Sequence, residues 1–312
     1  MSRTTLSEES VELRPEPPAP RRQGWLVPAV VVALLVAMVA FFLYGSGSGG
    51  EPDPGAAAMP SPNARWIFEI VGPITFFVLA VYFVVQAVRT RRFSTYGLVF
   101  FGCFAMWPQE FFADWGVYLL WNPAFELLPW DASRWTTPNK PWSLLACYGW
   151  YYVAVYPTIL GLMDRIRVRK PSWPRWVPLV AIVLPLFYLF DLALEGTAAY
   201  IGWWSYTEPW GPTLGKTAAN GFPMRFPLVH PLLIFVAYGL ITVWVMDQRD
   251  DLGRHRFEVL LGAHRLREGW RRQMARLASW AFMMNVLYFL FLIVPLVAIR
   301  EWTDFGNGTW VP

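Results

Sequence analysis

Uncharged and mostly apolar windows recur along the chain, separated by short segments rich in charge. A helix needs about 20 residues to cross the roughly 30 Å of hydrocarbon in a bilayer. We predict a transmembrane helix in each of seven windows: 23–50, 70–88, 93–109, 141–163, 176–190, 226–246 and 277–299. The third and fifth windows are short. Each spans the membrane only if its helix continues past an acidic residue, Glu110 or Asp191.

Basic residues fall unevenly between the alternate connections of these helices. With the amino terminus inside, all but six of the 26 Lys and Arg residues lie on the inner side. Because this asymmetry sets the orientation of membrane proteins, we predict a cytoplasmic amino terminus and an external carboxyl terminus. The fold class is therefore all-α integral membrane with seven transmembrane helices, in which a peripheral anchor helix at 25–44 precedes a six-helix core at 65–302.

The amino-acid composition agrees with a membrane protein and indicates which binding partners to expect. The chain is 55% hydrophobic and only 15% charged, which is unlike a soluble domain. Arginines at the inner membrane surface favour contact with anionic membrane lipid, so no nucleic-acid partner is expected. We place the protein in the bacterial cytoplasmic membrane as a multi-pass protein, and its oligomeric state stays open.

The remaining segments are predicted from their composition. Residues 1–24 read as a disordered cytoplasmic tail, 45–64 as a flexible Gly/Ser/Pro-rich external linker and 303–312 as an external tail. The long outer connections at 122–141 and 196–225 are expected to form structured lids, and no strands are expected. The inner connection at 247–276 reads as one amphipathic interfacial helix with Phe257, Leu260, Leu261, His264, Leu266 and Trp270 on a shared face.

Two of the predicted helices carry acidic residues at a similar depth in the membrane. Glu110 and Asp191 lie roughly 20 Å from the cytoplasmic ends of their helices. Asp114 and Glu195 follow four residues later, which places each pair on one helix face. Since a charge in hydrocarbon costs at least about 2.5–3.5 kcal/mol, these groups should face a sheltered interior and meet there. Two carboxyl groups forced together cannot both ionise cheaply, so one becomes a proton donor and the other a base.

Other polar residues are expected near this level. Glu69 begins the second predicted helix, Arg225 and His230 begin the sixth, and Asn285 lies nearer the middle of the seventh. Aromatic residues that can stabilise a developing cation accompany the acids: Trp107, Phe111, Phe112, Trp115, Tyr118, Tyr148, Trp150, Tyr151, Tyr152, Trp203, Trp204 and Tyr206. Packing and membrane-interface placement are commoner roles for such rings.

Structural roles compete with catalytic ones for several of these residues. Glu110 and Asp191 could form only a buried polar clasp between helices, and Asp114 and Glu195 could simply mark the membrane interface. His230 is the single histidine outside the inner connection, and a lone histidine is more often a satisfied interface residue than a catalyst. Arg225 could do no more than neutralise one acid.

Several chemistries are excluded by residues that the sequence lacks. No lysine lies inside a predicted span, which excludes a retinal Schiff base. Three histidines do not supply the clusters of a desaturase, the paired ligands of a haem or an HExxH zinc motif. Cys103 and Cys147 fall in different helices at different depths, so neither a disulfide nor a metal site is expected. No cofactor and no metal is therefore predicted.

At these residues the chain resembles the AveC-like spirocyclase family, actinobacterial membrane proteins named for the enzyme that closes the spiroketal of avermectin-type polyketides. The resemblance covers about residues 66–302. It rests on Trp107-Pro108-Gln109-Glu110, on Glu195 followed by Gly202-Trp203-Trp204-Ser205-Tyr206, on Arg225-Phe226-Pro227-Leu228 and on Arg249-Asp250-Asp251-Leu252-Gly253-Arg254. The family pattern has Gln-Asp in place of Gln109-Glu110. It has Gln-Phe-Pro-Leu and then an acid in place of the Arg225 motif and His230.

The leading hypothesis is a cofactor-independent membrane cyclase for an apolar, oxygenated small molecule. The resemblance implies spiroketal formation, with or without a further dehydration, in polyketide biosynthesis. Glu110 would be the general acid, Asp191 the base, and Glu195 or Asp114 an electrostatic support, while His230 and Arg225 would adjust their acidity. Candidate substrate-binding residues are Glu69, Trp107, Gln109, Tyr148, Tyr152, Trp204, Tyr206, Arg225 and Asn285.

Two other functions use the same features. A proton-initiated terpene or meroterpenoid cyclase would employ the same acids beside an aromatic-lined cavity. A non-enzymatic carrier of lipids or small molecules would instead have its acids neutralised by Arg225 and would have no enclosed pocket.

Overall fold

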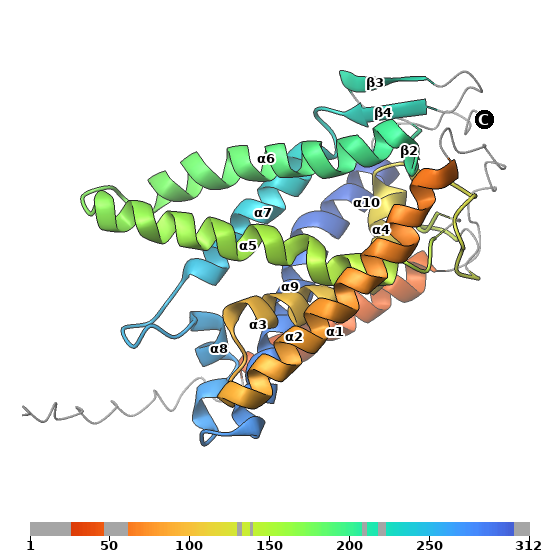
Figure 1. Cartoon of the computed structure of the whole chain (residues 1–312). Helices are drawn as coiled ribbons and strands as arrows, with labels where there is room; N and C mark the ends of the chain where they lie inside the picture. Colours follow the sequence, from red (N-terminus) through yellow and green to blue (C-terminus); the bar gives the residue numbers. More distant parts are fainter. Residues whose placement is uncertain are drawn as a thin grey trace, which may run out of the picture.

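The computed structural model describes residues 26–46, 62–129, 133–137, 140–207, 211–217 and 223–302. The predicted tails at 1–24 and 303–312, and most of the linker at 45–64, lie outside these residues. The described chain is mostly helical with two small sheets, and long helices run side by side along the molecule (Figure 1).

The helices are α1 (Leu26–Gly45), α2 (Gly72–Thr90), α3 (Thr95–Phe104), α4 (Glu110–Gly116), α5 (Leu144–Arg169), α6 (Trp176–Ile201), α7 (Leu232–Asp247), α8 (Arg256–Leu260), α9 (Trp270–Tyr288) and α10 (Val294–Trp302). Shorter or wider helical turns are η2 (Pro62–Ala64), η3 (Ile67–Val71), η4 (Trp107–Gln109), η5 (Ala263–Arg265) and η6 (Phe289–Ile293). The strands are β1 (Leu119–Trp121), β2 (Trp204–Tyr206), β3 (Thr213–Thr217) and β4 (Pro223–Pro227).

Four helical segments in the described chain are long and apolar enough to cross a membrane. They are Leu26–Gly45, Ile67–Thr90, Trp176–Ile201 and Trp270–Trp302. Large apolar side chains such as Phe77 and Val78 are exposed on these helices, as expected for a surface that faces lipid. The membrane character is thus supported, while seven spans and the orientation stay predictions.

The segment α3 lies at the centre of the helical packing, against α5 on one side and α9 on another. Leu98, Val99 and Phe100 of α3 are fully buried. Glycine allows one of the closest helix contacts. A Cβ at Gly239 of α7 would lie 2.5 Å from the ring of Phe187 on α6, so only glycine lets these helices approach so closely.

A break in the third predicted helix changes how its acids are presented. The chain leaves α3 at Phe104, makes the short turn η4, and starts a new helix at Glu110. Pro108 lies in this turn, and proline lacks the N–H that a continuing helix requires. The expected single outward helix is therefore wrong for this span. In contrast, α6 continues past Asp191 to Ile201 as predicted.

Short strands are a second correction to the all-α prediction. Antiparallel β1 and β2 join the two outer connections, with Leu119 opposite Tyr206 and Trp121 opposite Trp204. A second antiparallel pair, β3 and β4, covers residues 213–227. The sixth helix consequently begins at Leu232, and Arg225 lies on a strand instead of at a helix start. Three-residue strands leave too little alternation for sequence analysis to detect.

The inner connection also differs from the predicted amphipathic helix. It folds as a turn, the five-residue α8 and the short η5. Gly262 has a φ of 82° between them, which ends the helix. Phe257 is buried whereas Leu260 and Leu266 are exposed, so the expected apolar face is not continuous.

The first helix packs on the rim of the bundle. Phe42 contacts Phe112 and Phe289, with ring centroids 4.6 Å and 5.6 Å away, and the backbone N–H of Trp135 donates to the carbonyl of Gly45 at 2.8 Å. Most of α1 is nevertheless exposed.

Candidate functional site

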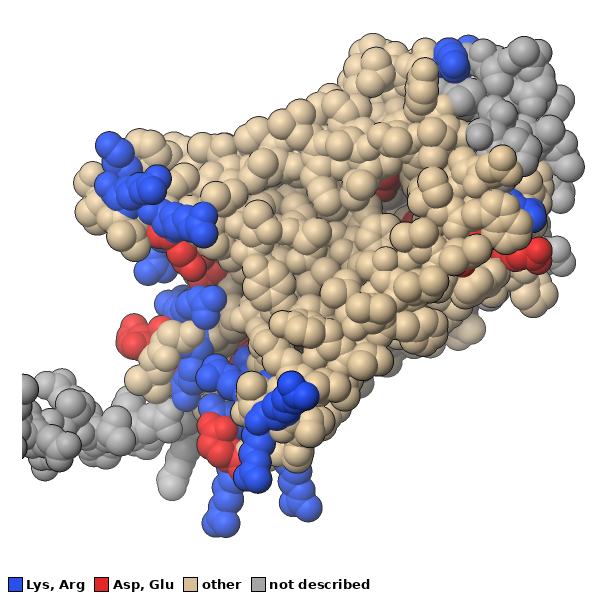
Figure 2. All heavy atoms as spheres, in the orientation of Figure 1, with Lys and Arg blue, Asp and Glu red and all other residues tan. Residues whose placement is uncertain are grey.

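A cavity of about 150 Å³ lies where α4, α5, α6 and the seventh predicted span meet the β1–β2 pair. Glu110, Asp114, Asp191 and Glu195 all line it. In Figure 2, acidic atoms are visible within a hollow of a broad uncharged surface. The predicted convergence of the acids from two helices is therefore present in the structure.

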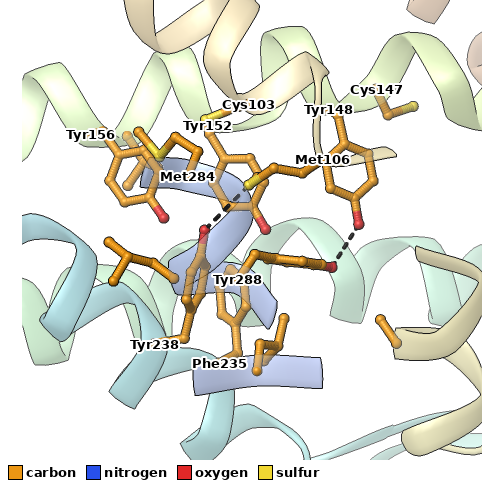
Figure 3. Close-up of a cluster of buried hydrophobic side chains, with 14 of the residues drawn as sticks. Cys103, Met106, Cys147, Tyr148, Tyr152, Tyr156, Phe235, Tyr238, Met284 and Tyr288 are labelled. Atoms are coloured by element: carbon orange, nitrogen blue, oxygen red, sulfur yellow. Dashed lines mark hydrogen bonds between the residues drawn. The ribbon is translucent and has the colours of Figure 1, made fainter. Parts of the chain in front are cut away.

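Glu110 is held by two tyrosines from different helices. Tyr148 of α5 donates a hydrogen bond to its carboxylate, and the Tyr288 hydroxyl of α9 lies 3.0 Å from Glu110 Oε2. The two tyrosine hydroxyls are themselves 2.6 Å apart (Figure 3). Glu110 is the first residue of α4, and its side chain lines the cavity.

Asp191 and Glu195 lie one turn apart on α6, and both line the cavity. The Tyr151 hydroxyl donates to Asp191 Oδ1 at 2.9 Å, and Tyr206 of β2 donates to Glu195. Two buried carboxyl groups on one face of a helix cannot both ionise cheaply, so this pair can present a proton donor beside an acceptor.

Asp114 has a partner that the sequence did not reveal. Lys140 is fully buried and forms an ion pair with the Asp114 carboxylate. The indole N–H of Trp121 donates to Asp114 Oδ2 at 2.8 Å, and Lys140 Nζ lies 2.5 Å from the hydroxyl of Thr137. The charge of Asp114 is thereby balanced and its side chain is held in place. In this respect Asp114 differs from the other three acids.

Lys140 was expected only as one of the outer basic residues. It stands in a long connection outside every predicted span, and no periodic pattern relates it to Asp114, 26 residues earlier. Tyr288 was missed for a similar reason, because a tyrosine in an apolar helix has the signature of ordinary core packing. A basic residue in an aromatic outer loop was the sole hint for Lys140.

Aromatic rings form much of the cavity wall, as predicted. Of the expected rings, those that line it are Tyr148, Trp150, Tyr151, Tyr152, Trp203, Trp204 and Tyr206. Trp121 and Trp204 meet across the β1–β2 pair with centroids 4.6 Å apart. Trp107, Phe111, Phe112, Trp115 and Tyr118 pack elsewhere and are not among the lining residues. The wall is therefore apolar apart from the carboxyl and hydroxyl groups.

Some predicted binding residues support the site from outside the cavity. Gln109 Nε2 donates to Asn285 Oδ1 at 2.8 Å, which ties the turn before α4 to α9. Glu69 is buried and accepts a hydrogen bond from the backbone N–H of Glu126 at 2.6 Å. These three polar side chains fix the backbone around the cavity but do not line it.

Two further predicted residues lie near the site without lining it. Arg225 is exposed on β4. His230 is buried just before Pro231, which does line the cavity. Burial lowers the pKa of His230 to about 4, so its ring is neutral near pH 7 and would not act as a cationic acid.

The two cysteines are free and buried, in agreement with the prediction that they form no disulfide. Figure 3 shows both sulfurs beside the tyrosine cluster, with their side chains directed away from each other. Cys147 lines the cavity wall, and its thiol donates to the carbonyl of Ser143 at 3.6 Å.

The fold and the site together define a helical protein of membrane type whose sheltered cavity combines carboxyl groups, tyrosine hydroxyls and aromatic faces. Such a set can donate and accept protons and stabilise positive charge. The chain belongs to the spirocyclase AveC-like family, whose family model matches residues 90–310. This family is associated with cyclase and dehydratase activity in polyketide biosynthesis. No curated protein and no solved structure matches the chain.

Proposed function

We propose that this protein is a membrane-embedded cyclase that forms a spiroketal from an apolar dihydroxyketone by acid–base catalysis. The observation that carries the proposal is the meeting of four carboxyl groups from α4 and α6 in one aromatic-lined cavity. Family membership supplies the reaction class, and the cavity supplies a proton donor, a proton acceptor and a surface for a cationic intermediate.

The reaction divides into two proton-coupled steps. One hydroxyl adds to the ketone, and its proton passes to the new hemiketal oxygen. Protonation of that hemiketal hydroxyl then releases water and leaves an oxocarbenium ion, which the second hydroxyl attacks with loss of its proton. The sum is the loss of one water, with no change of oxidation state.

Roles follow from the contacts of each acid. Glu110, held by two tyrosine hydroxyls, would protonate the departing hydroxyl. Asp191 would accept the proton of the attacking hydroxyl and share it with Glu195, one turn further along α6. Asp114 is paired with Lys140, so it would contribute a fixed charge and no proton.

The cavity wall suits the intermediate. Trp204 of β2 and Tyr152 of α5 both line it, and ring faces stabilise a nearby cation by roughly 0.5–2 kcal/mol each. A volume of about 150 Å³ matches a benzene-sized group. The cavity would therefore enclose the reacting ring atoms, while the rest of a long polyketide would lie in the bilayer.

Access from the bilayer is consistent with the position of the hollow. Leu194 lines the cavity and is 39% exposed on α6. The surface around the hollow in Figure 2 is uncharged. An apolar substrate would therefore reach the acids without leaving the lipid phase.

The same aromatic wall and acids would also suit protonation of an alkene or epoxide by a terpene or meroterpenoid cyclase. A non-enzymatic carrier is less well supported, because it predicted no enclosed pocket and acids neutralised by Arg225. The structure has a cavity, and the cation paired with Asp114 at its wall is Lys140.

Turnover of a synthetic dihydroxyketone by the purified full-length protein tests the proposal. Because such ketones also close spontaneously in acid, the rate and stereochemistry are measured at neutral pH against a protein-free reaction. Glu110→Gln and Asp191→Asn should each abolish the excess rate, whereas Glu126→Gln, an exposed outer acid, should retain it. Full turnover by both cavity variants would rule out the assigned roles, and turnover of an epoxy-isoprenoid alone would favour the terpene reaction.

A further inference from the structure

A second hollow, of about 290 Å³, lies at the end of the molecule that carries α8, and it shares no lining residue with the carboxyl cavity. Its walls come from the α2–α3 connection, the turn after α7, α8, η5 and the start of α9. The lining residues are Arg92, Thr95, Arg249, Leu252, Gly253, Arg254, His255, Glu258, Val259, His264, Glu268, Arg272, Gln273 and Arg276. We call it the arginine hollow.

Positive charge dominates the arginine hollow. Five arginines line it against two glutamates, and Figure 2 shows blue groups gathered at this end of the molecule. Arg272 pairs with Glu268, and Arg276 pairs with Glu258. Among the residues that the structure describes, Arg92 and Arg249 take part in no ion pair. The hollow therefore retains cationic groups that its own acids do not neutralise.

One wall is a rigid turn made by the motif Arg249–Arg254. The Asp250 carboxylate accepts hydrogen bonds from the backbone N–H groups of Leu252 and Arg254, at 3.1 Å and 2.8 Å. It also pairs with the Arg254 guanidinium at 2.7 Å. Gly253 has a φ of 72°, which favours glycine at that position. The turn thus fixes the backbone between Arg249 and Arg254. This rigid turn lies outside the carboxyl cavity.

The opposite wall holds another arginine in place. The Arg276 guanidinium donates to Glu258 and to Gln273, each at 3.0 Å. Gln273 and Glu258 are buried, and Glu258 also accepts the indole N–H of Trp280 at 2.6 Å. Arginine groups that are already ordered lose little freedom when they bind a ligand.

We propose that the arginine hollow binds a phosphate-bearing anion. Guanidinium groups present paired N–H donors that match phosphate oxygens, and several such groups around one concave site favour this ligand over a single carboxylate. The phosphate has two sources, the headgroup of an anionic phospholipid at the inner membrane surface or a soluble phosphate compound. The site is independent of the cyclase reaction.

Binding to two probes separates these sources. Full-length protein in neutral detergent is titrated with inorganic phosphate, and the same protein in phosphatidylcholine nanodiscs is titrated with phosphatidylglycerol. The test variant is Arg249→Gln with Arg272→Gln. The matched control is Arg169→Gln with Arg175→Gln, which removes two exposed arginines of another connection. The test variant should bind at least about tenfold more weakly, since charge-assisted hydrogen bonds are lost.

Each outcome decides the proposal. Loss of phosphate binding in the test variant assigns a soluble ligand, and loss of phosphatidylglycerol binding alone assigns a lipid headgroup. If the test variant proves misfolded, Arg92→Gln replaces it, because Arg92 makes no ion pair among the described residues. Binding of both probes equal to wild type, or an equal loss in the control, overturns the proposal.

Discussion

Lys140, from an outer connection, lies fully buried against Asp114 of α4 and forms an ion pair with it. The connection that carries Lys140 also reaches Glu69, whose side chain accepts the N–H of Glu126. Two polar contacts thus attach the outer connection to the helices. One of them, Lys140 with Asp114, involves an acid that lines the cavity. This arrangement makes the outer loop part of the site.

Lys140→Met should destabilise the protein, because it leaves the Asp114 carboxylate buried without its cation. Breaking a buried pair from one side costs about 3–5 kcal/mol, which a thermal-unfolding measurement in detergent resolves. Lys140→Met combined with Asp114→Asn should recover part of that loss. The exposed Lys216→Met is the control. An unchanged melting temperature for Lys140→Met would show that the pair is not formed.

Tyr288→Phe should lower turnover more than stability. It removes one hydroxyl from Glu110 at a cost of about 0.5–1.5 kcal/mol in folding, and it disturbs the position of the general acid. Tyr238→Phe is the control, because that hydroxyl contacts the sulfur of Met106 at 3.8 Å and no carboxyl group in the described chain. Equal turnover losses in the two variants would contradict a specific role for Tyr288.

Asp191→Asn and Glu195→Gln should be strongly non-additive. In the proposed mechanism the two side chains share one proton, so the double variant should be about as slow as the slower single variant. Turnover of all four proteins completes the cycle. Losses that multiply would indicate that the two carboxyl groups act independently.

Leu194→Trp should impede an apolar substrate at the mouth of the cavity. Leu194 is exposed on α6 and lines the cavity, so a larger ring there should raise KM several-fold with a smaller effect on kcat. Leu189→Trp offers a matched control, since Leu189 is exposed on the same helix and does not line the cavity. Identical kinetics for the two variants would place the substrate path elsewhere.

Acid should destabilise the fold in part through His230. Its pKa is about 4 in the folded chain and about 6.5 when unfolded. As the pH falls from about 6.5 towards 4, the unfolded chain therefore binds a proton that the folded chain refuses, and the free energy of unfolding falls by about 1–3 kcal/mol. His230→Gln should flatten this part of a melting-temperature profile relative to wild type, and parallel profiles would refute the assignment.

Much of the site's chemistry was readable from the sequence. Spacing of four residues between Glu110 and Asp114, and between Asp191 and Glu195, predicted two acid pairs, and the cost of charge in hydrocarbon predicted that they would meet. The aromatic wall followed from Tyr148, Tyr152, Trp204 and Tyr206. Gln109, Asn285 and Glu69 were predicted to bind substrate, but they do not line the cavity and hold the surrounding backbone instead.

The membrane class, the helical segments and the acid pairs are properties of local sequence, because hydrophobic length and helical spacing act over a few turns. The β1–β2 pairing and the burial of Lys140 arise from contacts between distant segments, whereas the break at Pro108 has a local cause that the predicted continuous helix overlooked. Three-residue strands and a single loop lysine have no periodicity of their own. Only the packing of the outer connections over α4 and α6 decided that Asp114 would pair with Lys140 and that all four acids would share one aromatic-lined cavity.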